Sequence, residues 1–199
     1  MAELFLYHHQ ILLTMAIQYV RLTDGSLPVF TFIKELYEGA FPWQERRDWP
    51  SLMALLKNPD MQLDLITAEQ RPIGFLIWWN IQGWLFIEHF AIAAAERSAG
   101  YGAAVMRHYL GMANGKVLLE VEPPVTVDAQ RRISFYEKLG LTVLDFPYEQ
   151  PSYVDQEVYY PMFLMGKLPE NEKQGFAEVI EAMKEKVYAK KKLTGRQAF

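Results

Sequence analysis

Apolar and polar positions change their spacing several times along this chain, and each change predicts a new element of secondary structure. Residues 17–23 alternate between apolar and polar side chains, which predicts a strand. Ser26 is then expected to cap a helix whose apolar residues recur every three or four positions as far as Ala40. A second, shorter helix is expected over 51–57, after Pro50.

Three further strands are predicted over 61–67, 73–80 and 84–92. Their connections are short, so we expect an antiparallel meander. A helix over 101–112 and a strand over 116–121 follow. Because a strand, a helix and a strand come in succession, the two strands are expected to pair in parallel through a right-handed crossover.

The last third of the chain continues the mixture of elements. A helix is predicted over 128–139, and strands over 141–144 and 158–165. After Pro169, apolar residues at helical spacing predict an amphipathic helix that ends in a basic tail at 190–192. We expect this helix to pack on the domain or on a second subunit, which would give a homodimer. The predicted fold class is α/β with a mixed sheet.

Length and hydropathy limit the number of domains. With 199 residues, of which 51% are hydrophobic, the chain is long enough for one compact domain. Residues 1–14 are too short and too polar to span a membrane, and they lack the features of a secretory signal. We interpret them as an extension ahead of a natural start at Met15, with a docking segment as the alternative.

Composition and charge exclude several classes of function. A formal net charge of −4 and an isoelectric point near 5.6 give no basic field, so we expect neither a nucleic-acid partner nor a membrane partner. The chain has no cysteine, which excludes disulfides, thiolate metal sites and a cysteine nucleophile and is compatible with the cytoplasm. The four histidines have no metal-ligand spacing, and no metal site is predicted.

The stretch after residue 92 has the character of an anion-binding loop. Arg97-Ser-Ala-Gly100-Tyr-Gly102-Ala103 lies between a predicted strand and a predicted helix. The two glycines allow a ligand to approach the backbone, and the first turn of the helix offers free N–H groups. The alternative is an ordinary capped turn. A nucleotide-binding loop is disfavoured, because no Lys-Ser or Lys-Thr follows the glycines.

Two motifs resemble a known family. Arg97-x-x-Gly100-x-Gly102 resembles the (Gln/Arg)-x-x-Gly-x-(Gly/Ala) signature of the GNAT superfamily of acyl-CoA-dependent N-acyltransferases, and residues 133–141 resemble its second motif, Phe-Tyr-Glu-Lys-Leu-Gly-Phe. The resemblance spans residues 15–168 and leaves 169–199 as an addition. It implies a mostly antiparallel sheet with a central parallel strand pair and flanking helices.

The resemblance implies an acetyl-CoA site and no metal. In the family, the pyrophosphate lies on backbone N–H groups of the glycine loop, and the pantetheine arm pairs with the preceding strand. Ser98 and Ala99 depart from the pattern, since glycine and a basic or polar residue are common there. The cofactor-binding residues implied here are Phe90, Ala91, Ile92, Arg97, Ser98, Ala99, Gly100, Tyr101, Gly102 and Ala103.

The catalytic roles implied by the resemblance fall on a tyrosine and a carboxylate. Tyr136 matches the family's general acid near the sulfur, with packing of a helix face as the alternative. Glu88 is the candidate base, and a surface ion pair is its alternative. Strand alternation places Glu88 and His89 on opposite faces unless a bulge intervenes, and His89 is expected to be structural. Glu120 and Glu122 are alternative acids, or mark a solvated edge.

These roles indicate an N-acetyltransferase that moves an acetyl group from acetyl-CoA to a primary amine. Without cysteine, direct attack in a ternary complex is the expected route. The alternative is a CoA-binding sensor domain without turnover. The acceptor is a small-molecule amine or a peptide amine, selected by loops near 41–47 and 148–160, where tyrosines such as Tyr148 are candidates for the pocket wall.

Overall fold

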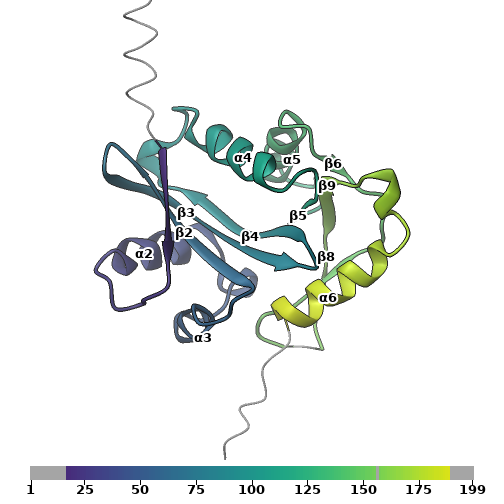
Figure 1. Cartoon of the computed structure of the whole chain (residues 1–199), viewed down its shortest axis with the longest axis horizontal. Helices are drawn as coiled ribbons and strands as arrows, with labels where there is room; N and C mark the ends of the chain where they lie inside the picture. Colours follow the sequence, from purple (N-terminus) through teal and green to yellow (C-terminus); the bar gives the residue numbers. More distant parts are fainter. Residues whose placement is uncertain (1–16, 156, 189–199) are drawn as a thin grey trace, which may run out of the picture.

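A seven-stranded sheet organises the chain (Figure 1). The computed structural model describes residues 17–155 and 157–188, so the predicted extension 1–14, the start at Met15 and the basic tail at 190–192 lie outside the described residues. The strands, in spatial order, are β1 (Ile17–Leu22), β2 (Met61–Ala68), β3 (Arg71–Ile81), β4 (Trp84–Ile92), β5 (Val117–Val121), β9 (Phe163–Lys167) and β6 (Thr142–Val143).

The pairing of the strands confirms the predicted topology. β1 to β4 form an antiparallel meander, and β4 pairs with β5 in parallel. The β4–β5 crossover contains a helix, α4 (Tyr101–Met112), as expected for parallel neighbours. The fold is therefore mixed α/β, with a mostly antiparallel sheet and one central parallel pair.

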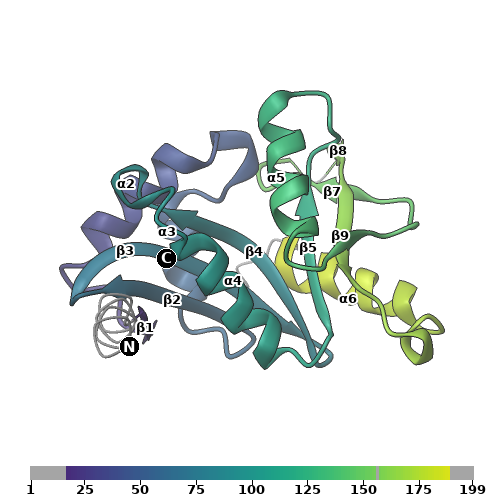
Figure 2. The same ribbon diagram turned by 90° about the horizontal axis from the view of Figure 1, so that it is seen from above.

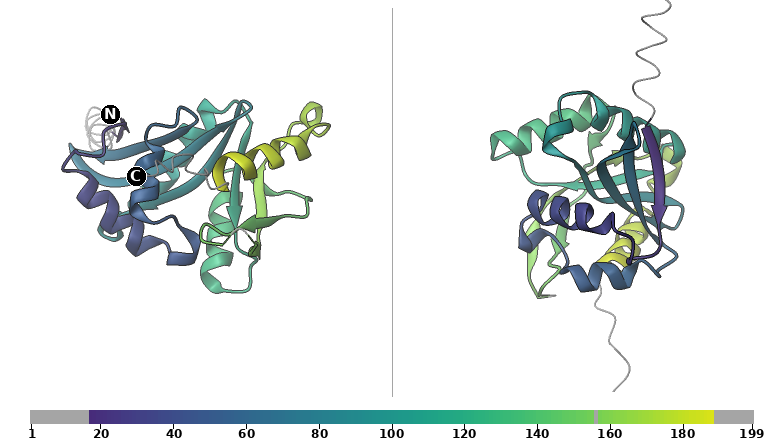
Figure 3. Two further views of the ribbon diagram at one scale, coloured as in Figure 1. Left: turned by 90° about the horizontal axis from the view of Figure 1, so that it is seen from below. Right: turned by 90° about the vertical axis from the view of Figure 1, so that its left-hand side faces the viewer.

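Helices cover both faces of the sheet and bury two separate apolar clusters (Figures 1 and 2). One face carries α4 and α5 (Val127–Glu137), whose buried side chains pack on β4 and β5. The opposite face carries α2 (Phe30–Ala40), α3 (Trp49–Leu55) and α6 (Phe176–Tyr188). Figure 3 shows α6 at the other end of this face from α2.

Two predicted helix starts are wrong. Ser26 does not cap α2, because its N–H is held by the Asp24 side chain at 2.9 Å in a turn, and the helix begins only after Val29. The short helix starts at Trp49 and not at 51, since Asp48 caps it by accepting a hydrogen bond from the Ser51 N–H at 2.9 Å. Pro50 thus lies in the first turn, where its missing N–H costs nothing.

The single strand predicted over 158–165 is in fact two. β8 (Tyr159–Pro161) pairs with β7 (Glu149–Pro151) in a separate two-stranded sheet, whereas β9 pairs with β5 and β6 in the main sheet. Pro161 lacks the N–H that a continuing ladder requires, and it ends β8. The β7–β8 hairpin packs beside α6.

The amphipathic helix predicted after Pro169 is confirmed as α6. Its apolar stripe packs on the domain, within the cluster that also contains α2 and α3. The side chains of this stripe are all buried: Phe176, Val179, Ile180, Met183, Val187 and Tyr188. Nowhere in 17–155 or 157–188 does the chain form a helix with the length and hydropathy needed to cross a bilayer.

Candidate active site

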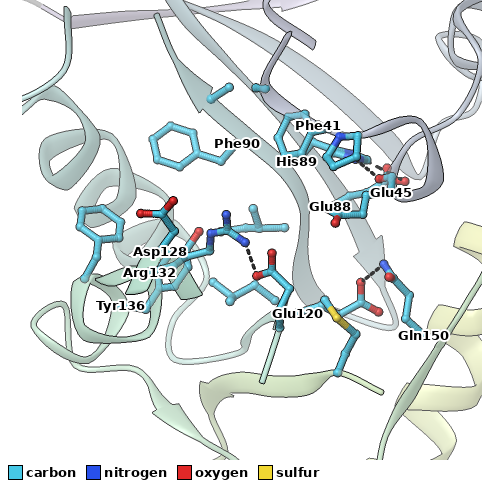
Figure 4. Close-up of a pocket in the computed structure, with 18 of the residues that line it drawn as sticks. Phe41, Glu45, Glu88, His89, Phe90, Glu120, Asp128, Arg132, Tyr136 and Gln150 are labelled. Atoms are coloured by element: carbon cyan, nitrogen blue, oxygen red, sulfur yellow. Dashed lines mark hydrogen bonds and ion pairs between the residues drawn. The ribbon is translucent and has the colours of Figure 1, made fainter. Parts of the chain in front are cut away.

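The main cavity opens where the parallel strands separate. β4 and β5 are paired only from Leu85 with Val117 to Ile87 with Leu119. Beyond this point residues 87–92 of β4 line a cavity of about 770 Å³ together with Leu119 and Glu120 of β5 and with Glu122, which follows β5 (Figure 4). The cavity is thus a gap in the sheet, with access to groups from both helical layers.

A β-bulge decides what faces this cavity. Ile77 pairs with His89 and Trp78 pairs with Ile87, so Glu88 is the extra residue on β4. The bulge overrides simple alternation: Glu88 and His89 both contact groups on the α2 and α6 face, and the prediction of opposite faces does not hold.

Glu88 lies in a buried network and not in a surface ion pair. Its side chain is 0% exposed and forms an ion pair with Arg47. Trp79 Nε1 donates to one carboxylate oxygen at 2.7 Å, and the Tyr153 hydroxyl donates to the other at 3.0 Å. Three donors from three separate segments therefore hold the carboxylate in one position.

His89 is held as a neutral ring. Its Nε2 lies 3.0 Å from the carbonyl oxygen of Glu45, whereas its buried Nδ1 has no hydrogen-bond partner among the described residues. Burial lowers the pKa of His89 to about 3. The rings of Tyr37 and Phe41 pack on it, with centroids 5.1 and 4.5 Å away. The surroundings agree with the predicted structural role, apart from the unpartnered Nδ1.

The end of β4 forms the cavity wall next to the predicted anion-binding loop. Phe90, Ala91 and Ile92 all line the cavity, and each pairs with β3 on the side away from β5. Arg97 also lines it, with its Nε donating to the carbonyl of Ile92 at 3.0 Å. The Arg97 side chain therefore fixes the end of β4 in addition to bringing a positive charge to the cavity.

The glycine loop, residues 97–103, continues from this wall into α4. Gly100 is the N-cap residue of α4 with φ 84°, and open space surrounds the position of a Cβ. No side chain caps the helix, so its first N–H groups are available to an anion. A Cβ on Gly102 would lie 3.9 Å from the Phe90 ring. Ser98, a departure from the family pattern, also has a positive φ, of 69°.

Residues 98–103 do not themselves line the cavity, unlike Phe90, Ala91, Ile92 and Arg97. The loop borders it through Gly102, which is near cavity-lining rings of Phe90 and Phe135. The geometry therefore brings the strand segment and the glycine loop together along one wall.

Tyr136 reaches the cavity from α5 (Figure 4). It is 8% exposed and belongs to the apolar cluster under α4 and α5, so it both packs a helix face and lines the cavity. Burial raises the pKa of Tyr136 to about 12, which keeps the phenol protonated at neutral pH.

Glu120 is a second carboxylate in the cavity wall, and it does not lie on a solvated edge. Gln150 Nε2 donates to it at 2.8 Å, the Tyr188 hydroxyl donates at 2.6 Å, and the Tyr148 hydroxyl donates to its other oxygen. Burial nonetheless raises the pKa of Glu120 to about 7. Glu122, two residues on, forms an ion pair with Arg132 and is partly exposed.

Arg47 ends the 41–47 segment that the sequence predicted to select the acceptor, although no role of its own was predicted for this residue. It is 8% exposed and lies between η1 (Trp43–Glu45) and α3. Besides pairing with Glu88, it donates to the carbonyl of Val187 in α6 and stacks over the Tyr153 ring at 4.7 Å. The signal in the sequence is the Arg46-Arg47 pair, which lies among aromatic residues.

Across 17–155 and 157–188, no group of three or more side chains of the kinds that bind metals could hold a metal ion.

Comparisons with known proteins agree with this geometry. The model of the GNAT acetyltransferase family matches residues 30–141. A solved structure from Bacteroides thetaiotaomicron, assigned to the GNAT acetyltransferases, has 30% identity and a TM-score of 0.79, covering 87% of this chain and 99% of its own. No curated protein matches the chain in sequence.

Two more distant structures share the fold. The ribosomal-protein-S18-alanine N-acetyltransferase from Escherichia coli has 18% identity and a TM-score of 0.52, with 78% of this chain and 97% of that chain covered. Mutant forms of a spermidine/spermine N-acetyltransferase from Vibrio cholerae have 13% identity and a TM-score of 0.57, with 79% and 96% covered.

Proposed function

This chain belongs to the GNAT family of acetyltransferases, and from that premise we propose that it transfers an acetyl group from acetyl-CoA to a primary amine in a ternary complex. The cavity carries this proposal, because its walls contain both the main chain of residues 90–92 and the carboxylates of Glu88 and Glu120. Acetyl transfer requires the acyl donor and the amine to be in contact, and in this proposal they meet between residues 90–92 and the two carboxylates.

The proposed donor site consists of residues 90–92 and the glycine loop. The uncapped first turn of α4 and the positive φ of Gly100 suit a pyrophosphate, and the separation of β4 from β5 leaves room for an extended arm beside β4. Arg97 contributes positive charge at the junction of these two parts. These features support the predicted acetyl-CoA contacts.

The proposed acid is Tyr136. When the amine nitrogen attacks the thioester carbonyl, a C–N bond forms and the C–S bond breaks. The Tyr136 phenol gives its proton to the departing thiolate, and the surplus proton on the nitrogen restores the phenol. A phenol with a raised pKa is fully protonated at neutral pH, which suits this role.

The proposed base must first take one proton from the acceptor ammonium. Glu88 is the residue predicted for this role from the sequence, and Glu120 faces the same cavity. The acceptor in this proposal is a small-molecule or peptide amine, and the protein acts in the cytoplasm. Both carboxylates would attract a cationic amine.

One observation favours a second candidate function, a CoA-binding sensor without turnover. Arg47 already forms an ion pair with the Glu88 carboxylate, so that group is engaged within the fold and not free for an incoming ammonium. The sensor would bind acetyl-CoA without amine-dependent release of CoA. The two functions therefore differ in a measurable product.

Tyr136→Phe tests the proposal. We expect amine-dependent CoA-thiol release to fall by roughly 100- to 10,000-fold, because the thiolate loses its acid, while the Kd for acetyl-CoA changes little. A panel of polyamines, amino acids and peptides supplies the acceptors, and calorimetry measures binding. Tyr19→Phe, at a half-buried tyrosine on β1 that does not line the cavity, is the matched control. Wild-type protein that binds acetyl-CoA but releases no thiol with any amine would favour the sensor.

A further inference from the structure

The last turn of α6 reaches into the wall of the cavity. Tyr188 is 6% exposed, and its hydroxyl donates to Glu120 at 2.6 Å. The same hydroxyl accepts a hydrogen bond from Gln150 Nε2 at 2.9 Å, and Gln150 also donates to Glu120 at 2.8 Å. The three groups form a closed triangle of hydrogen bonds around one Glu120 oxygen.

The main chain of the same turn holds the other carboxylate. Arg47 donates to the carbonyl of Val187 through one nitrogen and pairs with Glu88 through another. Tyr153, which donates to Glu88, packs on the Tyr188 ring with centroids 5.0 Å apart. Two consecutive residues at the end of α6 thus touch the networks of both Glu88 and Glu120.

The two carboxylates differ in their partners. Glu88 is paired with the Arg47 guanidinium, whereas the side chains that donate to Glu120 within the described part of the chain are neutral. The titratable and charged groups that act on Glu120 come from the segments around β7, from α6 and from the loop before α3: Tyr148, Tyr153, Tyr188 and Arg47. Burial outweighs the donors and raises the pKa of Glu120 to about 7. A carboxyl group in that range exchanges protons readily at neutral pH.

We propose that the end of α6 is part of the acceptor site, and that the Tyr188 hydroxyl is a positioning group that holds Glu120 to take the proton of the bound ammonium. This inference rests on the proposed acetyl transfer. The ammonium N–H bond breaks, the proton passes to a Glu120 oxygen, and the free amine then attacks the thioester. Glu88 keeps Arg47 in place, and Arg47 in turn fixes α6 through Val187.

Tyr188→Phe in the full chain tests the positioning role. Removing the donor destabilises the ionised carboxylate, so the pKa of Glu120, followed by carboxyl NMR without substrate, should rise by about one pH unit. Gln150→Met removes another donor and should raise it in the same direction, which provides a second variant if Tyr188→Phe folds poorly. Tyr19→Phe should leave it unchanged.

The rate profile supplies an independent readout. With an active amine, the kcat/KM of the wild type should decrease as the pH falls below about 7, because the base must be ionised. In Tyr188→Phe this acidic limb of the pH profile should move to higher pH by the same amount as the NMR titration of Glu120. Glu120→Gln should abolish the limb.

The outcomes separate this inference from the proposed function. An unchanged Glu120 titration in both Tyr188→Phe and Gln150→Met, even with a lower melting temperature, would reduce Tyr188 to a packing residue and overturn the inference. A limb that persists in Glu120→Gln would also overturn it. If the titration shifts as expected but no amine supports CoA release by the wild type, acetyl transfer fails and the proton-acceptor role fails with it, whereas the contact between Tyr188 and Glu120 stands.

Discussion

The two halves of the cavity are built by different means. The proposed donor half comprises residues 90–92 in the cavity wall and the glycine loop beside it, one short stretch that ends at the start of α4 and is proposed to bind mainly through main chain. The acceptor half uses side chains from segments far apart, with Arg47, Glu88 and Glu120 as its charged members. Backbone sites depend on local conformation, whereas side-chain sites depend on how the whole domain packs. The two halves should therefore respond differently to substitution.

The largest effect is expected in the acceptor half, from Arg47→Met. Removing the guanidinium leaves the Glu88 carboxylate buried without its counter-charge, which should cost about 3–5 kcal/mol in the free energy of unfolding. Denaturant titration measures this change. Glu88→Gln in the same chain should recover part of the loss, because the unpaired charge is then absent.

Arg131→Met is the matched control for that measurement. The Arg131 side chain is 78% exposed and pairs with an exposed Asp128, so its loss should change the unfolding free energy by less than about 0.5 kcal/mol. Equal effects of the two substitutions would mean that the acceptor half does not depend on a buried ion pair.

A smaller effect, confined to ligand binding, is expected in the donor half from Gly100→Asp. An L-residue at φ 84° is strained, and a carboxylate there repels a pyrophosphate, so the Kd for acetyl-CoA should rise roughly 100-fold. Calorimetry measures the Kd. Gly111→Asp, with open space around its Cβ position near the other end of α4, should leave the Kd almost unchanged. Undiminished affinity in Gly100→Asp would remove the loop from the donor site.

The sequence predicted the strand and the helix around the proposed donor half because their signals are local. The strand over 84–92 and the helix over 101–112 are confirmed at both ends, since an apolar run, a turn and a glycine-bordered helix fall within thirty residues. The predicted start of α2 was wrong because Asp24 holds the Ser26 N–H in a turn, and the helix begins only after Val29. Residue-type rules for helix caps do not detect such a turn.

The acceptor half could not be derived in the same way. Glu120 binds Tyr148, Gln150 and Tyr188, which are 28, 30 and 68 residues away along the chain. Its spacing with Glu122 fitted a solvated edge equally well. The alternation of side chains along a strand predicts which residues share a face, but it does not predict what covers that face. The roles of Tyr136 and Glu88 stay predictions, although both side chains line the cavity.

The central claim is that donor and acceptor occupy one cavity together. Initial rates of CoA-thiol release, measured over a grid of acetyl-CoA and amine concentrations with the best amine of the panel, test it most directly. Intersecting double-reciprocal lines are expected, because both substrates must be bound before the acetyl group moves. Parallel lines, or release that does not depend on the amine, would contradict the account.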